Sequence, residues 1–153
     1  MRYWITLHWP HSADPAHDVP WNVYLQHRWR RKGQRLSPGE KVAFYETGSG
    51  PRFVRKGTKV IEKLTRGRQA AVGVAEVTGN MRPRPPDVSV LEYEDGTTQN
   101  WGWEVPCGSH RWGKPVPLGA VLGILNRGTI RVAGGIIEMD KSQYEELVRR
   151  LGL

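Results

Sequence analysis

The stretch GEKVAFYETGSG, from Gly39 to Gly50, decides the fold prediction. Its first part, EKVAFYE, is rich in β-branched and aromatic residues, which is typical of a strand. Two large rings, Phe44 and Tyr45, end this strand, and a polar turn with two glycines follows directly. A ring in this position can stack on a planar ligand while the polar groups of the turn bind the edge of that ligand.

Further strands are predicted on both sides of this stretch. The segment RYWITLH, residues 2–8, is predicted to be the first strand. The segment QAAVGVAEVTG, residues 69–79, is predicted to be a strand that is buried on both faces. Residues 90–106 form a predicted hairpin with an Asp-Gly turn, and residues 129–139 form the last predicted strand. The three prolines of residues 81–87 exclude regular structure there.

Helices are predicted in four segments, and the signals at their ends differ. Thr58 is the predicted N-cap of the second helix. The third is predicted to begin at Pro117 and to end at Gly128, and the fourth has capping-box spacing between Ser142 and Glu145. The predicted helical segments are residues 20–29, 58–66, 117–128 and 140–153.

Together these elements predict an α+β fold, in which a small mixed sheet curls into a partly open β-barrel flanked by short helices. A doubly wound parallel sheet is excluded, because it needs a helix after nearly every strand. The chain of 153 residues has the length of one domain, so residues 1–153 are predicted to form a single domain.

Basic side chains are concentrated in the first half of the chain. Residues 1–69 hold 14 Lys and Arg against 5 Asp and Glu, a net +9, whereas residues 70–153 hold 9 against 10, a net −1. The segment 27–68 alone has 13 basic and 3 acidic residues. A solvated surface normally mixes both signs. The asymmetry therefore favours a polyanionic partner, most simply a nucleic acid, over a generic basic surface.

The composition argues against several other classes. A single cysteine, Cys107, excludes a disulfide framework and a cysteine-rich metal site, and indicates a reducing, cytoplasmic setting. No apolar run approaches the roughly 20 residues of a membrane span. His11, Asp14 and His17 follow no zinc spacing, so neither a metal nor a cofactor is expected. The segment CGSH, with Cys107 and His110, is predicted to be a surface loop with a half-buried thiol rather than a nucleophile and its base.

Seven tryptophans are many for this length. Trp4 is predicted to lie in the core, because tryptophan buries a large area. Several others lie beside Asn, His, Arg or Gly, and rings next to positive charge suit a site for stacked or flipped bases. The carboxylates Glu46, Glu76 and Glu104 lie in or at the end of predicted strands. There they either accept hydrogen bonds from a base or form salt bridges with arginines.

The order of the segments carries further information. It runs RYWITLHWP, GEKVAFYETGSG, AAVGVAEVTG, PVPLGAVLGILNRG and RVAGGIIEMDKSQYEEL. In this order nearly the whole chain resembles an EVE domain of the PUA-like superfamily, and the pair VAFYETGSG and VGVAEV is also similar to the YTH readers of methylated adenine. The resemblance implies a PUA-like curled sheet that binds nucleic acid with a modified base, which relatives hold, flipped out, in an aromatic pocket. EVE domains are often coupled to modification-dependent restriction nucleases, so a nuclease is the implied protein partner.

Candidate site residues follow from this resemblance and from side-chain chemistry. Trp9 and Trp21 lie where such domains build pocket walls, and Trp101 and Trp103 alternate on one predicted strand, so they share a face. An asparagine amide offers both a donor and an acceptor to the edge of a base. The predicted base-binding pocket consists of Trp9, Trp21, Asn22, Tyr45, Glu46, Thr47, Asn100, Trp101 and Trp103. The predicted phosphate-binding residues, some of them in a basic insertion at 51–68 that YTH readers lack, are Arg28, Arg30, Arg31, Lys32, Arg52, Arg55, Lys56, Arg66 and Arg68.

The leading hypothesis is a non-catalytic module that flips and recognises a methylated or hydroxymethylated base in DNA, such as 5-methylcytosine or N6-methyladenine. Two alternatives stay open. One is an RNA reader of the YTH or PUA type. The other is an amidohydrolase of modified cytidine, which the neighbouring ASCH branch of the superfamily implies; it would use lysine, threonine and glutamate side chains, here Lys41, Thr47 and Glu46.

Overall fold

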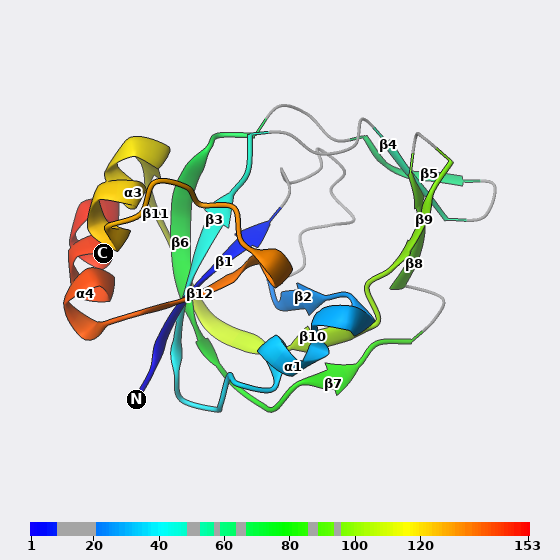
Figure 1. Ribbon diagram of the computed structural model, residues 1–153, viewed down its shortest axis with the longest axis horizontal. Coiled ribbons are helices and arrows are strands. Elements are labelled where there is room, and N and C mark those ends of the chain that lie inside the picture. The colour runs from blue at the N-terminus through cyan, green and yellow to red at the C-terminus, as the bar shows by residue number, and fades with distance from the viewer. Residues whose placement is uncertain (9–20, 49–52, 57–58, 64–66, 86–88, 94–95) are drawn as a thin grey trace.

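A computed structural model of the protein has a five-stranded sheet at its centre, in the order β11-β6-β3-β1-β12 (Figure 1). The described residues are 1–8, 21–48, 53–56, 59–63, 67–85, 89–93 and 96–153. The strands of the central sheet are β1 (Tyr3–His8), β3 (Lys41–Glu46), β6 (Ala70–Val77), β11 (Cys107–Pro117) and β12 (Ile136–Met139). Strands β1 and β3 are parallel and the other neighbours are antiparallel, so the sheet is mixed.

The helices are short. Two of them, α3 (Leu118–Leu125) and α4 (Lys141–Leu151), lie together against one face of the central sheet (Figure 1). The shorter helical turns are η2 (His27–Trp29), α1 (Arg30–Gly33) and η3 (Ala133–Gly135). In the part of the chain that the structure describes, no helix has the length and apolar character that crossing a membrane requires.

Two smaller sheets complete the β-structure of the described residues. One contains, in order, β2 (Val23–Leu25), β10 (Trp103–Val105) and β7 (Arg82–Pro83). The other contains β5 (Lys59–Lys63), β4 (Phe53–Lys56), β8 (Val90–Tyr93) and β9 (Thr98–Asn100). Figure 1 shows this four-stranded sheet at the end of the molecule far from α3 and α4. The predicted fold class, a curled and unclosed mixed sheet with short helices, is confirmed.

Both faces of the central sheet are buried, and β3 contributes to a core on each side. Ala43 and Tyr45 enter the helix-side core, whereas Val42 and Phe44 enter a second core on the opposite face, because successive side chains of a strand point to opposite faces. Trp4 lies in this second core, as predicted, and is 1% exposed. The helix-side core also includes Ile5, Val74, Tyr144, Leu147 and Leu151.

The predicted helix over residues 20–29 does not form. Val23 and Leu25 are buried in strand β2, Tyr24 between them is half-buried, and the short turn η2 follows. Strand β2 pairs with β10, which is remote in sequence. This long-range pairing overrides the helical spacing that the local pattern shows.

Two further segments predicted to be helical or irregular contain strands. Residues 59–63 form β5, the hairpin partner of β4, rather than the predicted helix over 58–66. The proline-rich residues 81–87 include the two-residue strand β7, which pairs with β10. The predicted hairpin of residues 90–106 is confirmed over residues 90–100, where β8 pairs antiparallel with β9, whereas residues 103–105 form β10 in the other small sheet.

The predicted ends of the last two helices are wrong in detail. Helix α3 ends at Leu125 and is capped by Asn126, which has the left-handed φ of 52°, rather than by Gly128. At the start of α4, the capping box is formed by Asp140 and Gln143 rather than by the Ser142–Glu145 pair. Each of the two residues donates its backbone N–H to the side chain of the other, at 2.8 and 2.9 Å.

Strand β11 has no counterpart among the predicted elements. Its sequence, CGSHRWGKPVP, holds two glycines and two prolines, which weaken any strand prediction. It nevertheless pairs along the whole of β6, from Cys107 opposite Val77 to Pro117 opposite Ala70, with two bulges on the way. The segment CGSH, predicted to be a surface loop, therefore begins an edge strand.

A buried carboxylate ties the start of β3 to the start of β1. Glu40 is 6% exposed and lies directly before β3. Its Oε2 accepts a hydrogen bond from Nε of Arg2 at 2.9 Å, and its Oε1 accepts from Nε1 of Trp4 at 3.1 Å and from the Ser37 N–H at 2.8 Å. Burial by itself raises the pKa of this carboxyl, but the hydrogen bonds outweigh burial and hold the pKa below its ordinary value of 4.5.

We expect Glu40→Gln to lower the free energy of unfolding by about 1.5–3 kcal/mol at neutral pH, because charge-assisted hydrogen bonds are lost inside the protein. Since folding lowers the pKa of Glu40, its contribution is present above pH 4.5 and is lost as the pH falls through the folded-state pKa. The difference between variant and wild type therefore shrinks in acid. Urea denaturation at neutral and acidic pH measures both effects.

The matched control is Glu138→Gln, which removes an exposed ion pair with Arg35. We expect this change to cost less than about 1 kcal/mol, because exposed ion pairs contribute little to stability. Equal losses for the two variants at neutral pH would contradict the prediction.

Candidate functional site

Five aromatic side chains meet at the face of the central sheet that points away from α3 and α4. His8 stacks on Trp21 with ring centroids 4.8 Å apart, and His110 stacks on Trp112 at 5.8 Å. Phe44 contacts both pairs, with its ring centroid 5.1 Å from that of His8 and 5.8 Å from that of His110. Trp21 and Trp112 also meet edge to face at 5.2 Å. Together these five residues form the aromatic cluster.

Each ring of the aromatic cluster is positioned by a strand or by its end. His8 is the last residue of β1, Phe44 lies in β3, and Trp21 shortly precedes β2. His110 and Trp112 are alternate residues of β11, so they project to the same side of that strand. Three strands of the central sheet thus bring together residues that are far apart in sequence.

Gly73 of β6 makes room for the ring of Trp112. In the register of the sheet, Gly73 lies opposite Trp112 on one side and opposite Phe44 on the other. A Cβ atom at position 73 would lie 2.4 Å from Cε3 of Trp112 and 2.7 Å from the carbonyl oxygen of Arg111. These distances are well below van der Waals contact, so the close approach of the indole requires glycine.

Trp112 is the exposed member of the aromatic cluster. Its side chain is 49% exposed, whereas Trp21 is 9% and Phe44 0% exposed. A half-exposed indole that rests on buried rings presents a flat apolar surface to solvent. Planar ligands, nucleic-acid bases among them, stack on such surfaces.

The two histidines add defined hydrogen-bonding groups to the cluster. Nε2 of His110 lies 2.6 Å from the carbonyl oxygen of Trp21, which only accepts, so this nitrogen carries a proton and donates. Nε2 of His8 forms a hydrogen bond with Oγ1 of Thr6 at 3.0 Å. Burial lowers the pKa of His8 to about 3, so this ring is neutral at physiological pH. The cluster therefore combines apolar ring surface with an uncharged imidazole.

Trp9, Trp21 and Tyr45 are predicted pocket residues near the ends of strands. Trp21 belongs to the aromatic cluster. Tyr45 does not, because its side chain is 2% exposed and packs in the helix-side core, on the opposite face from Phe44. A ring enclosed by core residues cannot stack on a base, which corrects the assignment of Tyr45 to the pocket. Trp9 lies outside the described residues.

The exit of β3 is held together by an ion pair. Glu46 is 4% exposed and accepts hydrogen bonds from the backbone N–H and from Nη2 of Arg68, both at 2.9 Å. A predicted pocket carboxylate and a predicted phosphate-binding arginine thus engage each other. The N–H of Thr47 donates to the carbonyl oxygen of His8 at 2.8 Å, which continues the β1–β3 pairing.

Asn22 has a structural partner at each end of its side chain. Its Nδ2 donates to Oε2 of Glu104 at 2.9 Å, and its Oδ1 accepts from the N–H of Cys107 at 2.9 Å. Glu104 also forms an ion pair with Arg82 at 3.2 Å. Because Asn22 links the chain before β2 to β10 and β11, a base would have to displace these bonds, and the role of Asn22 in recognition stays a prediction.

Trp101 and Trp103 do not alternate on one strand as predicted. Trp103 belongs to β10, and its Nε1 donates to Nδ1 of His27 at 3.1 Å. Trp101 lies between β9 and β10, and its backbone N–H donates to the carbonyl oxygen of Ser89 at 2.8 Å. Asn100 is the exposed last residue of β9. These residues lie in the smaller sheets and their connections, apart from the strands that carry the aromatic cluster.

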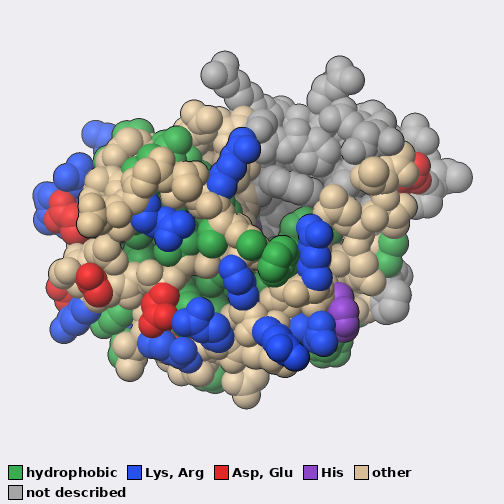
Figure 2. All heavy atoms as spheres, viewed as in Figure 1, with side chains coloured by type: hydrophobic (Ala, Val, Ile, Leu, Met, Phe, Trp, Pro, Cys, Tyr) green, Lys and Arg blue, Asp and Glu red, His purple; other side chains and the backbone are tan. Residues whose placement is uncertain are grey.

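The predicted phosphate-binding residues near the first helical turns form a basic surface. Arg28 and Lys32 lie over the ring of Trp29, at 5.2 and 5.6 Å from its centroid, and Lys32 also donates to a backbone carbonyl of η3. Arg30 and Arg31 belong to α1, and Arg31 is exposed. Figure 2 shows Lys and Arg side chains spread over the face of the molecule that contains α1.

The remaining predicted phosphate contacts lie in or near the basic insertion. Arg55 and Lys56 belong to strand β4, and Arg68 is paired with a carboxylate as described above. Arg52 and Arg66 lie outside the described residues. The placement of these side chains around a ligand therefore stays a prediction.

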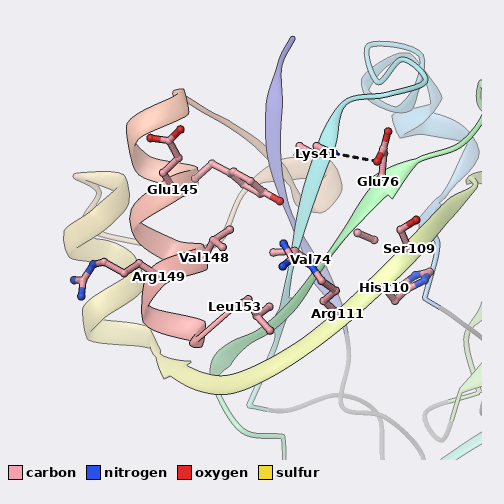
Figure 3. A pocket seen from close by; sticks show the side chains of 12 residues that line it. Lys41, Val74, Glu76, Ser109, His110, Arg111, Glu145, Val148, Arg149 and Leu153 are labelled. Carbon is pink, nitrogen blue, oxygen red and sulfur yellow. Dashed lines mark hydrogen bonds and ion pairs between the residues drawn. The ribbon is translucent and has the colours of Figure 1, made fainter.

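A cleft of about 600 Å³ lies beside helix α4, lined by residues of β3, β6 and β11 (Figure 3). On one side Lys41 is paired with Glu76 at 3.0 Å. On the other side Ser109, His110 and Arg111 reach the cleft from β11, where Ser109 has the left-handed φ of 51° at a bulge. His110 thus belongs to the aromatic cluster and also borders this cleft.

The chemistry of Cys107 is that of a structural thiol. Its Sγ donates to the carbonyl oxygen of Val105 at 3.6 Å, and burial raises its pKa to about 12. The nucleophilic thiolate is therefore scarce at neutral pH. Within the described ranges, no three His, Cys, Asp or Glu side chains are grouped so as to hold a metal ion, and residues 11–17 lie outside those ranges.

Solved structures match this chain over its whole length. Human THYN1, solved in complex with DNA that contains 5-methylcytosine, has a TM-score of 0.59 at 10% identity, covering 100% of this chain and 99% of that one. A protein from Leishmania major has a TM-score of 0.60 at 17% identity, covering 99% of this chain and 95% of that one. A protein from Agrobacterium tumefaciens has a TM-score of 0.54 at 16% identity, covering 100% of this chain and 94% of that one. No family model and no curated protein matches the sequence. At these identities the likeness shows the fold alone.

We expect Gly73→Ala to displace the Trp112 ring and to lower the free energy of unfolding by about 1–3 kcal/mol, because the new methyl group overlaps the indole and a backbone carbonyl. Gly123→Ala is the matched control, since a Cβ there meets no atom within 4 Å. This change should raise the free energy of unfolding by about 0.5–1 kcal/mol, because glycine destabilises a helix relative to alanine. Urea denaturation measures both changes. The indole N–H resonance of Trp112 reports the displacement of the ring, and it is assigned by its absence from the spectrum of Trp112→Phe. If Gly73→Ala neither shifts this resonance nor lowers stability, the close approach of the indole to Gly73 is contradicted.

We expect His8 to stay neutral down to about pH 4, because burial lowers its pKa to about 3. The ordinary value is 6.5, so the unfolded chain binds this proton first, and the contribution of His8 to stability is lost as the pH falls from 6.5 to about 3. NMR of the imidazole nitrogens measures the titration, and His8→Gln should lack this part of the pH dependence. A His8 pKa near 6.5 would show that the ring is solvated.

Proposed function

We propose that the protein is a nucleic-acid-binding module of the EVE type, and that residues 1–153 form this one domain. In this proposal it recognises a methylated or hydroxymethylated base in DNA, which leaves the duplex and packs against Trp112. The observation that carries the proposal is the half-exposed Trp112 ring, which three further aromatic rings contact, those of Trp21, Phe44 and His110. The fold adds support, because human THYN1, which shares it, was solved with DNA that contains 5-methylcytosine.

The energetics explain why such a module needs several rings. Stacking on an aromatic side chain contributes about 1–3 kcal/mol per base. Taking a base out of the duplex costs a few kcal/mol. A buried methyl group adds on the order of 1 kcal/mol. The balance is therefore close, and a fit to the modification decides whether binding is favourable.

The neutral imidazole of His8 suits an uncharged, methylated base. His8 is held without a positive charge by burial, and His110 has one nitrogen engaged with the Trp21 carbonyl. A neutral imidazole offers a donor and an acceptor, as the edge of a base does. Direct hydrogen bonds from these rings would orient the base, while Trp112 supplies the stacking surface.

General affinity for the nucleic-acid backbone comes, in this proposal, from the basic residues of η2 and α1. Arg28 and Arg31 are exposed, and within the described residues neither forms an ion pair with a carboxylate. Phosphate contacts of this kind are independent of sequence and weaken as salt rises. A nuclease subunit is the partner that the EVE resemblance favours, since a reader without catalysis needs an enzyme to act on what it binds.

An amidohydrolase has less support than a reader. Lys41 and Glu46 are the first and last residues of β3, so their Cα atoms are about 17 Å apart. Lys41 is paired with Glu76, and the backbone of Thr47 continues the strand pairing. The three side chains that such chemistry would use therefore do not converge on one bond.

We expect Trp112→Ala to weaken binding to a duplex with 5-methylcytosine by about tenfold or more, because one base loses its stacking partner. Discrimination against the unmodified duplex should fall with it. Fluorescence anisotropy with duplexes that differ only in one base (cytosine, 5-methylcytosine, 5-hydroxymethylcytosine, or N6-methyladenine in place of adenine) measures both quantities. Val90→Ala, which trims an exposed apolar side chain on β8, is the control and should bind as the wild type does.

Two outcomes would change the proposal. Equal affinity of the wild type for all duplexes removes the recognition of a modification. Tighter binding to RNA of the same sequence than to DNA favours the RNA reader instead.

A further inference from the structure

Strand β11 is an edge of the central sheet, because β6 is its one neighbour in the sheet order. Arg111, Trp112 and Lys114 of this strand are all exposed. Among the described residues, neither Arg111 nor Lys114 forms an ion pair with a carboxylate. An exposed aromatic ring thus has, on each side of it along the chain, a cation without a carboxylate partner in the described part of the structure.

The edge presents the ring and the arginine to different faces of the sheet. Arg111 and Trp112 are consecutive, so their side chains point in opposite directions. Trp112 joins the aromatic cluster, while Arg111 lines the cleft beside α4 (Figure 3). A bulge between Gly108 and Arg111, with Ser109 in a left-handed conformation, redirects the strand at this point. A ligand that crosses the edge would meet the ring on one side and the guanidinium on the other.

Arg111 is the cation of this cleft whose charge has no acidic partner within the described residues. Lys41 is paired with Glu76 at 3.0 Å, and Arg149 is paired with Glu146 at 2.6 Å. Glu76 and Glu145 also line the cleft, so Arg111, at the sheet edge, is the lining cation that remains for an anionic group entering from that edge.

Protection of the sheet edge explains only part of this arrangement. Edge strands often carry a lysine that prevents pairing with another chain, and Lys114 fits that purpose. The same purpose does not account for an arginine that is directed into a cleft, nor for a half-exposed tryptophan between the two cations. Ligand binding accounts for all three side chains together.

We propose that the edge of β11 binds the two phosphates that flank the base on Trp112, one through Arg111 and the other through Lys114. This inference rests on the proposed function, and it adds a backbone contact outside the basic residues 28–32. A flipped nucleotide leaves the duplex with its own phosphates, so the groups that bind them must lie within reach of the ring, here on the two faces of the β11 edge. The planar guanidinium suits two parallel hydrogen bonds to one phosphate, whereas the lysine acts as a point charge.

The test measures affinity for the preferred modified duplex as a function of salt concentration. We expect Arg111→Ala and Lys114→Ala each to reduce the slope of log K against log salt by about 1, and the double variant by about 2, since each change removes one phosphate contact. Arg149→Ala is the matched control, because this arginine borders the same cleft but is paired with Glu146. Its slope should equal that of the wild type.

A second set of variants separates charge from geometry. Arg111→Lys should keep the slope and lose affinity, because the charge remains while the paired hydrogen bonds do not. Trp112→Ala should keep the slope and lose discrimination. Arg111→Gln replaces Arg111→Ala if melting shows that the alanine variant is not folded.

The outcomes distinguish this inference from the proposed function. A wild type that binds no modified nucleic acid sinks the proposed function. A wild type that binds, with slopes unchanged in Arg111→Ala, Arg111→Gln and Lys114→Ala, overturns the assignment of phosphates to the β11 edge and leaves the proposed function standing.

Discussion

The structure depends on the register of a sheet that is buried on both faces. In β3, Phe44 enters the second core and Tyr45 enters the helix-side core, and a shift of one residue would exchange them. The parallel pairing that sets Thr6 opposite Phe44, together with the buried Glu40 at the start of the strand, opposes such a shift. The aromatic cluster forms because this register delivers Phe44 to the same face as Trp21. Strand register, rather than the polar turn after the strand, therefore decides which rings reach the site.

Local patterns predict those parts of the fold in which composition and burial agree. They suffice for β1, β3, β6 and the two helices α3 and α4, whose apolar residues recur with a clear period. They do not suffice for β11, because its glycines, prolines and charges resemble a loop, and its strand character comes from pairing with β6. The polar neighbours of Trp21 in the sequence make it a candidate, and it lies in the aromatic cluster, whereas Tyr45 is buried in the helix-side core, because sequence near a strand end does not show which face a side chain takes. The importance of Trp112 becomes visible only when pairing sets it opposite Gly73.

Counting charges along the chain and locating them in space lead to different views of the electrostatics. The count points to residues 27–68, yet within that segment Arg68 is held by Glu46 and Arg35 by Glu138. The other half of the chain, with no net positive charge, supplies Arg111, which has no carboxylate partner among the described residues and lies beside the exposed ring. Summed charge governs the encounter with a polyanion at long range. In the proposed function, individual contacts near the ring position the nucleic-acid backbone.

The environment of Cys107 has a practical consequence for spectroscopy. Thiol-directed reagents attack the thiolate, and a half-buried thiol with a pKa near 12 supplies little of it at neutral pH. Cys107, the single cysteine of the sequence, should therefore react little with such reagents during chemical labelling. A fluorophore can be attached through one introduced surface cysteine in an otherwise wild-type chain, so energy transfer to a dye on an oligonucleotide becomes a direct measure of how the protein sits on its ligand.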